Sequence, residues 1–309
     1  MDVAVLVVNA GSRTLKLHVV DGDESRPVDS FAQDVDAVAH RVVHGGPRFH
    51  EAVVVDDEVR AEIERLEPLA PLHNVHAVRA LDEARRALPN VPHVAVFDTA
   101  FHATIPDVAS TYAVPQRWRE WGVRRYGFQG HSVQWCAEQV PVSRLVVCHL
   151  GGGSSVSAVR DGRSIDTTMG FTPLEGVPMT TRSGSVDPGL VVYLLREHGF
   201  TADELDHALN LESGLKALSG TSGDMREVET AGGLALDLYV YRVAAAVGAM
   251  AVALGGLDAI AFTGGVGENS ATVRERICAN LGFLEPFDVH VVEAREELVA
   301  ARAAREVLA

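Results

Sequence analysis

The chain is poor in cysteine and in basic residues, and both shortages narrow the classes of protein to which it can belong. Its 309 residues include three cysteines, Cys136, Cys148 and Cys278, without C-x-x-C spacing, which favours reduced thiols in a cytoplasm over a disulfide framework. Lys and Arg number 27 against 42 Asp and Glu, so the net charge is −15, and no basic cluster opposes it. Nucleic acid and anionic membranes are therefore not expected as partners.

Export and membrane segments are lacking as well. Asp2 leads directly into an apolar strand, without the basic and apolar regions of a signal peptide. The most apolar run, residues 243–256, is shorter than the roughly 20 residues that cross a bilayer, and it is rich in Ala and Gly. It predicts a closely packed, buried helix, and we expect a cytoplasmic protein.

The common nucleotide-binding motifs are missing too. Neither G-x-x-x-x-G-K-[ST] nor G-x-G-x-x-G occurs, so a P-loop or Rossmann site is not indicated. Alternating strand and helix patterns instead predict an α/β architecture, and the length predicts two domains. The expected strands are 3–8, 15–20, 38–44, 93–97, 144–149, 155–159 and 258–263, and the expected helices are 73–88, 203–210, 233–255 and 270–281.

Two segments repeat one pattern, which predicts a duplicated fold. Residues 5–23, VLVVNAGSRTLKLHVVDGD, form an apolar strand, a polar turn and a second strand, and residues 145–163, LVVCHLGGGSSVSAVRDGR, follow the same order. The first turn holds Ser12 and Thr14, and the second holds two adjacent serines. Because amide N–H groups and hydroxyls gathered in a turn bind anions, we interpret both as phosphate-binding hairpins.

A third glycine-rich element strengthens this interpretation. In AIAFTGGVGENSATVRERI, an expected strand leads into Gly264–Gly265–Val266–Gly267 and then into a helix. A helix start carries unpaired N–H groups and a partial positive charge, which suits a phosphate. Three such elements in one chain predict a nucleotide-binding protein.

The motifs carrying these features occur in the order found in acetate kinases. VNAGSRTLKL, HRVVHGG, APLHN, VFDTAFH, RRYGF, DTTMGFTPLEGVPMTTRSGSVDPG, SGDMRE, FTGGVGEN and EELVAAR span nearly the whole chain, which therefore resembles that family. The resemblance implies an α/β fold of two ribonuclease-H-like (actin-like ATPase) domains of duplicated topology around a nucleotide cleft. It also implies transfer of a phosphoryl group from ATP to acetate or propionate, with Mg²⁺, in a homodimer. We expect an acyl and phosphate domain over 1–143, joined by the C-terminal helix 293–309, and a nucleotide-binding domain over 144–292.

The resemblance assigns the catalytic roles to particular residues. Arg41 and Arg182 would bind the carboxylate and the transferring phosphoryl, since planar guanidinium groups suit both anions. Asp98 would orient an arginine or activate the carboxylate. Val43, Leu72, Phe128 and Pro173 would form the small apolar pocket for the acyl group, and Asn9 with Glu296, or its neighbour Glu297, would hold Mg²⁺. The expected nucleotide and phosphate contacts are Asn9, Ser12, Thr14, Lys16, His149, Gly151, Gly152, Gly153, Ser154, Asp224, Met225, Arg226, Gly265, Val266 and Asn269.

The chain departs from the family pattern at a few positions. Where the family reads Tyr-Gly-Phe-His-Gly-Thr-Ser-His, residues 126–133 read YGFQGHSV, so Gln129 replaces the phosphoryl-stabilising histidine and a new histidine, His131, follows two positions later. Either side chain could take over the hydrogen bond to the phosphoryl oxygens. Pro47 replaces a Glu after HRVVHGG, Ser185 replaces an Asp, and the segment before Arg41 is short.

Three alternatives to an active acyl kinase remain at this stage. The chain could be a nucleotide-binding protein that has lost turnover, or another kinase or ATPase of the same superfamily, because a fold does not determine an activity. His73 and His76, one helical turn apart, also raise the weaker possibility of a zinc hydrolase.

Overall fold

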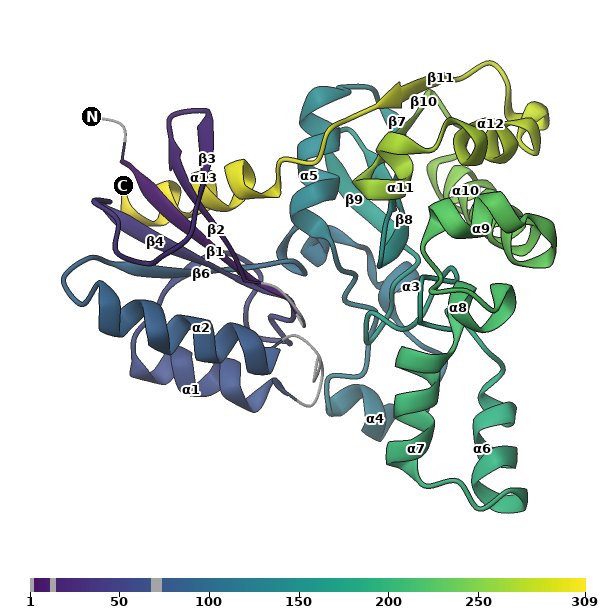
Figure 1. Ribbon diagram of the computed structural model, residues 1–309, viewed down its shortest axis with the longest axis horizontal. Helices are drawn as coiled ribbons and strands as arrows, with labels where there is room; N and C mark the ends of the chain where they lie inside the picture. Colours follow the sequence, from purple (N-terminus) through teal and green to yellow (C-terminus); the bar gives the residue numbers. More distant parts are fainter. Residues whose placement is uncertain (1–2, 12–14, 68–73) are drawn as a thin grey trace. The chain divides into compact units, whose positions relative to one another are not determined.

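The computed structural model describes residues 3–11, 15–67 and 74–309, which divide between two compact units (Figure 1). The first unit takes the described residues of Met1–Thr104, Ala113–Trp135 and Arg295–Ala309. The second takes Ile105–Tyr112 and Cys136–Ala294. Each unit is built around one β-sheet.

The sheet of the first unit has the strand order β3-β2-β1-β4-β6-β5. Strands β1 to β3 form an antiparallel meander, whereas β1, β4 and β6 run parallel. The strands are β1 (Val5–Ala10), β2 (Leu15–Asp21), β3 (Glu24–Val28), β4 (Ala37–Val42), β5 (Val53–Val54) and β6 (His93–Phe97).

Helices cover both faces of this sheet. α1 (Asp57–Arg65) and α2 (Asn74–Ala87) pack on one face, and α13 (Glu296–Leu308) packs on the other (Figure 1). Strands buried on both faces are apolar throughout, and this explains why all five residues of β6 are buried. The C-terminal helix therefore completes the core of the first unit.

The sheet of the second unit repeats this topology. Its order, β9-β8-β7-β10-β11, matches β3-β2-β1-β4-β6, with the same antiparallel and parallel pairings. The expected α/β fold of duplicated topology is thus confirmed. The strands are β7 (Arg144–Leu150), β8 (Ser154–Arg160), β9 (Arg163–Thr167), β10 (Ala259–Thr263) and β11 (Asp288–Val291).

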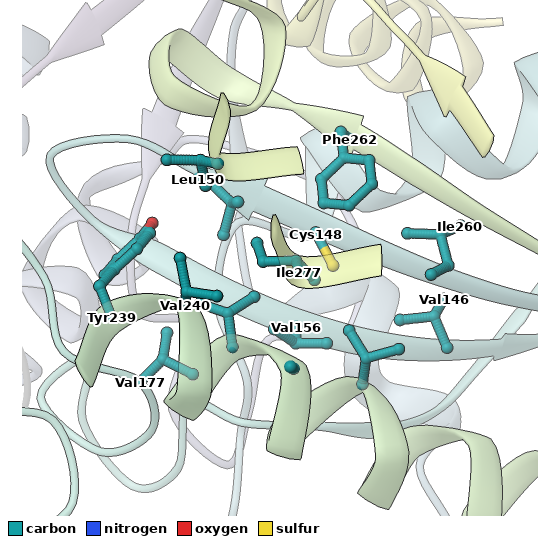
Figure 2. Packing of buried hydrophobic residues seen from close by; sticks show 14 of the residues in the cluster. Val146, Cys148, Leu150, Val156, Val177, Tyr239, Val240, Ile260, Phe262 and Ile277 are labelled. Atoms are coloured by element: carbon teal, nitrogen blue, oxygen red, sulfur yellow. The ribbon is translucent and has the colours of Figure 1, made fainter. Parts of the chain in front are cut away.

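A long apolar helix, α10 (Gly233–Leu254), fills the core of the second unit. Tyr239 and Val240 belong to the same buried cluster as Val146, Leu150 and Val156 of the sheet (Figure 2). Within the described residues, α10 alone is long and apolar enough to cross a membrane. Half of its most apolar stretch is buried inside the protein, however, and core helices of soluble proteins can be equally long and apolar. It is the packed helix that its sequence predicts.

The other helices are short. They are η2 (Ala100–Thr104), α3 (Asp107–Ser110), α4 (Gln116–Glu120), α5 (Gly130–Gln139), α6 (Pro188–Glu197), α7 (Ala202–His207), η3 (Ala208–Glu212), α8 (Gly214–Ser219), α9 (Met225–Ala231), α11 (Gly264–Asn269), α12 (Ala271–Ala279) and η4 (Gly282–Leu284). Thr201 and Glu204 form the predicted capping box of α7. The sequence patterns did not reveal β3, β5, β9 or β11; β11 (DVHV) alternates polar and apolar residues but is only four residues long, and all four are exposed.

Three buried histidines make the first unit sensitive to acid. His40 on β4 stacks on His93 of β6, with His40 Nε2 2.9 Å from His93 Nδ1, and His40 Nδ1 has no hydrogen-bond partner among the described residues. Burial, with the neighbouring His93 and Arg85, lowers the pKa of His40 to about 3. Burial also lowers the pKa of His93, and it lowers the pKa of His102 to about 4.

We expect the free energy of unfolding to fall as the pH drops from 6.5 toward 4. The folded protein holds these histidines neutral while the unfolded chain protonates them near pH 6.5, so acid favours the unfolded state; His40 alone accounts for about 3 kcal/mol at pH 4. In urea titrations, His40→Leu should flatten this decline, whereas His290→Asn, at an exposed position, should not. Equal pH dependence in wild type and His40→Leu would contradict the assignment.

Candidate active site

Arg41 and Asp98 meet at one edge of the first sheet. Arg41 lies near the end of β4, Asp98 directly follows β6, and these neighbouring strands are parallel, so their carboxyl ends share an edge. Arg41 Nε donates to Asp98 Oδ1 at 2.8 Å and Arg41 Nη2 donates to Asp98 Oδ2 at 2.6 Å. Arg41 and Asp98 thus form a bidentate ion pair, which holds the guanidinium plane in one orientation.

The pair is buried and charged. Asp98 is 1% exposed. Burial opposes the charge on both groups, but the adjacent Arg41 and the hydrogen bond from His131 bring the pKa of Asp98 far below its usual range. Likewise, burial is outweighed by Asp98 and Glu296, which together raise the pKa of Arg41 above its usual value. Asp98 therefore favours its ionised form, and its two hydrogen bonds fix the orientation of Arg41.

Two oxygen-bearing side chains lie on the other side of the guanidinium. Arg41 Nη1 is 3.2 Å from Asn9 Oδ1 and 3.1 Å from Glu296 Oε2. Glu296 is the first residue of α13, and α13 packs against β1 and β4, which carry Asn9 and Arg41. Glu297 instead accepts from Arg295 Nε at 3.1 Å. Of the two glutamates named from the sequence, Glu296 is the one beside Arg41.

The segment that departs from the family pattern also adjoins this cluster. Gln129 has a left-handed backbone (φ 60°), which is uncommon for a residue other than glycine. Gly130 follows, and a β-carbon there would lie 2.2 Å from the carbonyl oxygen of Asp98, so only glycine fits. His131 Nδ1 lies 2.9 Å from Asp98 Oδ1. The chain thus brings His131 to Asp98, a partner that the sequence did not reveal.

Two of the residues expected to line the acyl pocket, Val43 and Phe128, belong to the first unit. Both are buried, and the Phe128 ring contacts the His44 ring edge-on at 5.2 Å between centroids. The Phe128 carbonyl lies 2.9 Å from His102 Nε2. His102 is a supporting residue that the sequence analysis did not single out, although it stands in the VFDTAFH motif.

Two of the glycine-rich loops that we expect to bind phosphate adjoin each other in the second unit. His149 pairs in register with Thr263 where β7 and β10 end together. A β-carbon on Gly264 would lie 3.0 Å from His149 Nε2, and one on Gly151 would lie 3.7 Å from the amide nitrogen of Gly265. The carboxyl ends of parallel strands are where α/β proteins bind ligands.

The third loop differs from its expected form. The glycines do not precede the helix but build it, because α11 begins at Gly264 itself (φ 77°). The Gly264 N–H donates to Glu268 Oε1 at 3.0 Å, and Asn269 Nδ2 donates to the Gly265 carbonyl at 2.9 Å. The Gly264 N–H is therefore already occupied by a side chain of its own helix.

The expected adenosine motif forms the start of α9. Asp224 caps the helix by accepting from the Arg226 N–H at 2.9 Å, and its carboxylate also pairs with the Arg226 guanidinium. These Arg226 hydrogen bonds lower the pKa of Asp224 to about 2. Met225 is buried, while the Arg226 side chain is 90% exposed. The motif thus builds a helix cap with an exposed arginine beside it.

Arg182 belongs to the second unit and has a different environment from Arg41. Its Nη1 contacts the Pro173 carbonyl oxygen at 3.4 Å and Met179 Sδ at 3.9 Å. Burial lowers the pKa of Arg182, whereas the pKa of Arg41 is raised. The surroundings thus stabilise the charge of Arg182 less well than water does.

Some candidate residues cannot be placed. Ser12, Thr14, Leu72 and His73 lie outside the described residues. Lys16 is exposed on β2, opposite Asn9 in register. Within the described ranges there is no group of three His, Cys, Asp or Glu side chains that could hold a metal ion, so the zinc interpretation gains no support.

The chain is similar to known proteins over most of its length. The profile of the Acetokinase family matches residues 23–304. The acetate kinase of Acaryochloris marina is 50% identical over 270 residues, which cover 83% of this chain and 68% of that protein. The acetate kinase of Protochlamydia amoebophila is 43% identical over 309 residues, which cover 89% of this chain and 78% of the relative.

Solved structures agree with the sequence comparison. A propionate kinase from Francisella tularensis superposes with a TM-score of 0.90 at 30% identity, covering 97% of this chain and 98% of that one. The acetate kinase of Porphyromonas gingivalis gives 0.88 at 31% identity, covering 99% and 100%. By its profile match, its relatives and its fold, the chain belongs to the acetokinase family.

Proposed function

We propose that this protein transfers the terminal phosphoryl group of ATP directly to a short carboxylate, acetate or propionate, yielding the acyl phosphate and ADP. A carboxylate oxygen forms the new bond to phosphorus as the bond to the ADP oxygen breaks. Catalysis of this kind depends on positioning and charge stabilisation. The observation that carries the proposal is the cluster of Arg41, Asp98, Asn9 and Glu296 in a member of this family.

In this proposal the two arginines bind anions. Arg41 arrives oriented by Asp98, with donors remaining on its terminal nitrogens, and a bound phosphoryl or carboxylate would favour the charge of Arg182, whose pKa burial lowers. Gly151, Gly152, Gly153, Gly265 and Val266 would approach the phosphates, and Asp224, Met225 and Arg226 the adenosine. Gln129 would donate its neutral amide to the phosphoryl oxygens in place of the family histidine.

Mg²⁺ fits the residues beside Arg41. Asn9 Oδ1 and Glu296 Oε2 both lie within 3.2 Å of Arg41 Nη1, and an amide and a carboxylate oxygen are the few protein ligands that Mg²⁺ uses when substrate phosphates supply the rest. Bound there, the ion would neutralise charge on the phosphate oxygens. We therefore assign Glu296, rather than Glu297, to the metal.

A second copy of the chain is the proposed partner. α6 carries Leu190, Val192, Tyr193 and Leu195, each at least 40% exposed, and none of its residues is buried. An apolar helix left uncovered in this way marks an interface. A cytoplasmic homodimer requires twice the 33.0 kDa of one chain, a mass that light scattering measures.

The function is tested by trapping the acyl phosphate with hydroxylamine, using ATP, Mg²⁺ and carboxylates of increasing length. Hydroxamate from acetate or propionate, with equal release of ADP, supports the proposal. ATP binding without hydroxamate from any carboxylate would replace the proposal with a nucleotide-binding protein that has lost turnover. ATP hydrolysis or sugar phosphorylation alone would indicate another kinase or ATPase of the superfamily.

The size of the acyl pocket gives a prediction. Butyrate should be a poor substrate, and Val43→Ala should shift kcat/KM toward propionate by about 1–3 kcal/mol, the value of one methylene in such a pocket. Competition assays with acetate and propionate measure the shift, and Val54→Ala, which trims an exposed valine on β5, is the matched control. If butyrate is the best substrate of the wild type, Val43 and Phe128 do not limit chain length.

A further inference from the structure

His131 faces Asp98 instead of standing free to bind a substrate. It is the second residue of α5 and is 5% exposed, and its Nδ1 lies 2.9 Å from Asp98 Oδ1. An ionised carboxylate can only accept hydrogen bonds, so Nδ1 is the donor and carries the proton. The family pattern has a threonine here, whose side chain does not titrate.

Asp98 and Arg41 share their hydrogen bonds with this histidine. Asp98 Oδ1 accepts from both Arg41 Nε and His131 Nδ1, while Oδ2 accepts from Arg41 Nη2. Three of the five N–H groups of Arg41 are hydrogen bonded within the described residues, two of them to Asp98. How firmly Asp98 holds Arg41 therefore depends on what else the carboxylate binds.

We propose that His131 is a positioning residue: its Nδ1–H holds the Asp98 carboxylate, and through it the guanidinium of Arg41, in the orientation that substrate anions require. This proposal rests on the kinase function proposed above. Because Asp98 Oδ1 accepts from both residues, a change at His131 is transmitted to Arg41.

Two substitutions test the positioning role. His131→Thr supplies a hydroxyl that can donate to Asp98 but cannot become charged, whereas His131→Ala supplies no donor. We expect His131→Ala to lower kcat about 10–10²-fold, because a misplaced Arg41 loses alignment with the phosphoryl group. We expect His131→Thr to keep kcat within a few-fold of wild type at pH 8.

Rescue by the conservative variant is the readout that a merely structural role would not move. Both substitutions remove the imidazole ring, so lost packing would lower kcat in both, whereas only His131→Ala lacks a donor to Asp98. Should His131 instead donate directly to the phosphoryl group, His131→Thr would lose as much kcat as His131→Ala. That result would overturn the proposal.

A measurement without turnover keeps this inference distinct from the kinase assignment. In ¹⁵N NMR spectra of the substrate-free protein at pH 8, the neutral His131 ring should be the Nδ1–H tautomer, and the Arg41 Nε–H signal should move in His131→Ala. Neither signal depends on whether the protein phosphorylates anything. The Arg41 signal should return toward its wild-type position in His131→Thr and stay there in Gln129→Ala. An Nε2–H tautomer, or an Arg41 signal indifferent to His131→Ala, would refute the coupling.

Discussion

Replacing Arg41 with alanine is expected to lower kcat for acyl phosphate formation by at least 10²-fold, or about 2.7 kcal/mol of transition-state stabilisation. It should also destabilise the first unit, because it leaves the buried Asp98 carboxylate with His131 as its one side-chain partner among the residues that the structure describes. Breaking a buried ion pair from one side typically costs about 3–5 kcal/mol. Activity and the thermal midpoint should therefore fall together.

Two further variants separate the catalytic loss from the structural one. Arg41→Lys keeps the charge near Asp98 but cannot make two parallel hydrogen bonds, so it should recover stability while kcat remains depressed. Arg48→Ala removes an exposed arginine that pairs with Glu58 on the surface and should leave both quantities unchanged. Normal kcat in folded Arg41→Lys would mean that a point charge at this position suffices. Normal kcat in folded Arg41→Ala would remove Arg41 from the catalytic residues.

Replacing Arg182 with alanine is expected to lower kcat by at least 10²-fold without lowering stability. Burial depresses the pKa of Arg182, so the folded protein holds its charge at a cost, and removing the guanidinium relieves that cost. The thermal midpoint should stay the same or rise. Sites that bind substrates are commonly less stable than they could be, because their residues serve function. We therefore expect Arg41→Ala and Arg182→Ala to lower kcat alike but to change the thermal midpoint differently.

Steady-state kinetics and thermal unfolding of Arg182→Ala test this prediction. Arg276→Ala is the matched control in the second unit, because it removes an arginine that pairs with Asp237 at the surface. A large drop in the midpoint with little change in kcat would make Arg182 a structural residue. A loss of kcat alone would support its role as an anion-binding group.

Local sequence patterns determined much of the architecture. The hairpins β1–β2 and β7–β8 follow from apolar runs interrupted by short polar turns, and their likeness predicts the duplicated sheets. The long helix α10 follows from its apolar composition. These features depend on residues close together in the chain, whose spacing and turn chemistry are legible without a structure. The exposed edge strand β11 is only four residues long, and its pairing with β10 is what makes it a strand.

The residue types that form the site could be predicted from the sequence, but the contacts between them could not. Arg41 and Asp98 are 57 residues apart, and the register of β4 against β6 is what places them together. The packing of α13 on the first sheet selects Glu296 over Glu297, and Gly130 brings His131 to Asp98 by its close approach to that residue's carbonyl. A sequence names the groups that can donate, accept or carry charge. Only the packing of distant elements decides which of them meet, because burial and charge act over distances in space and not along the chain.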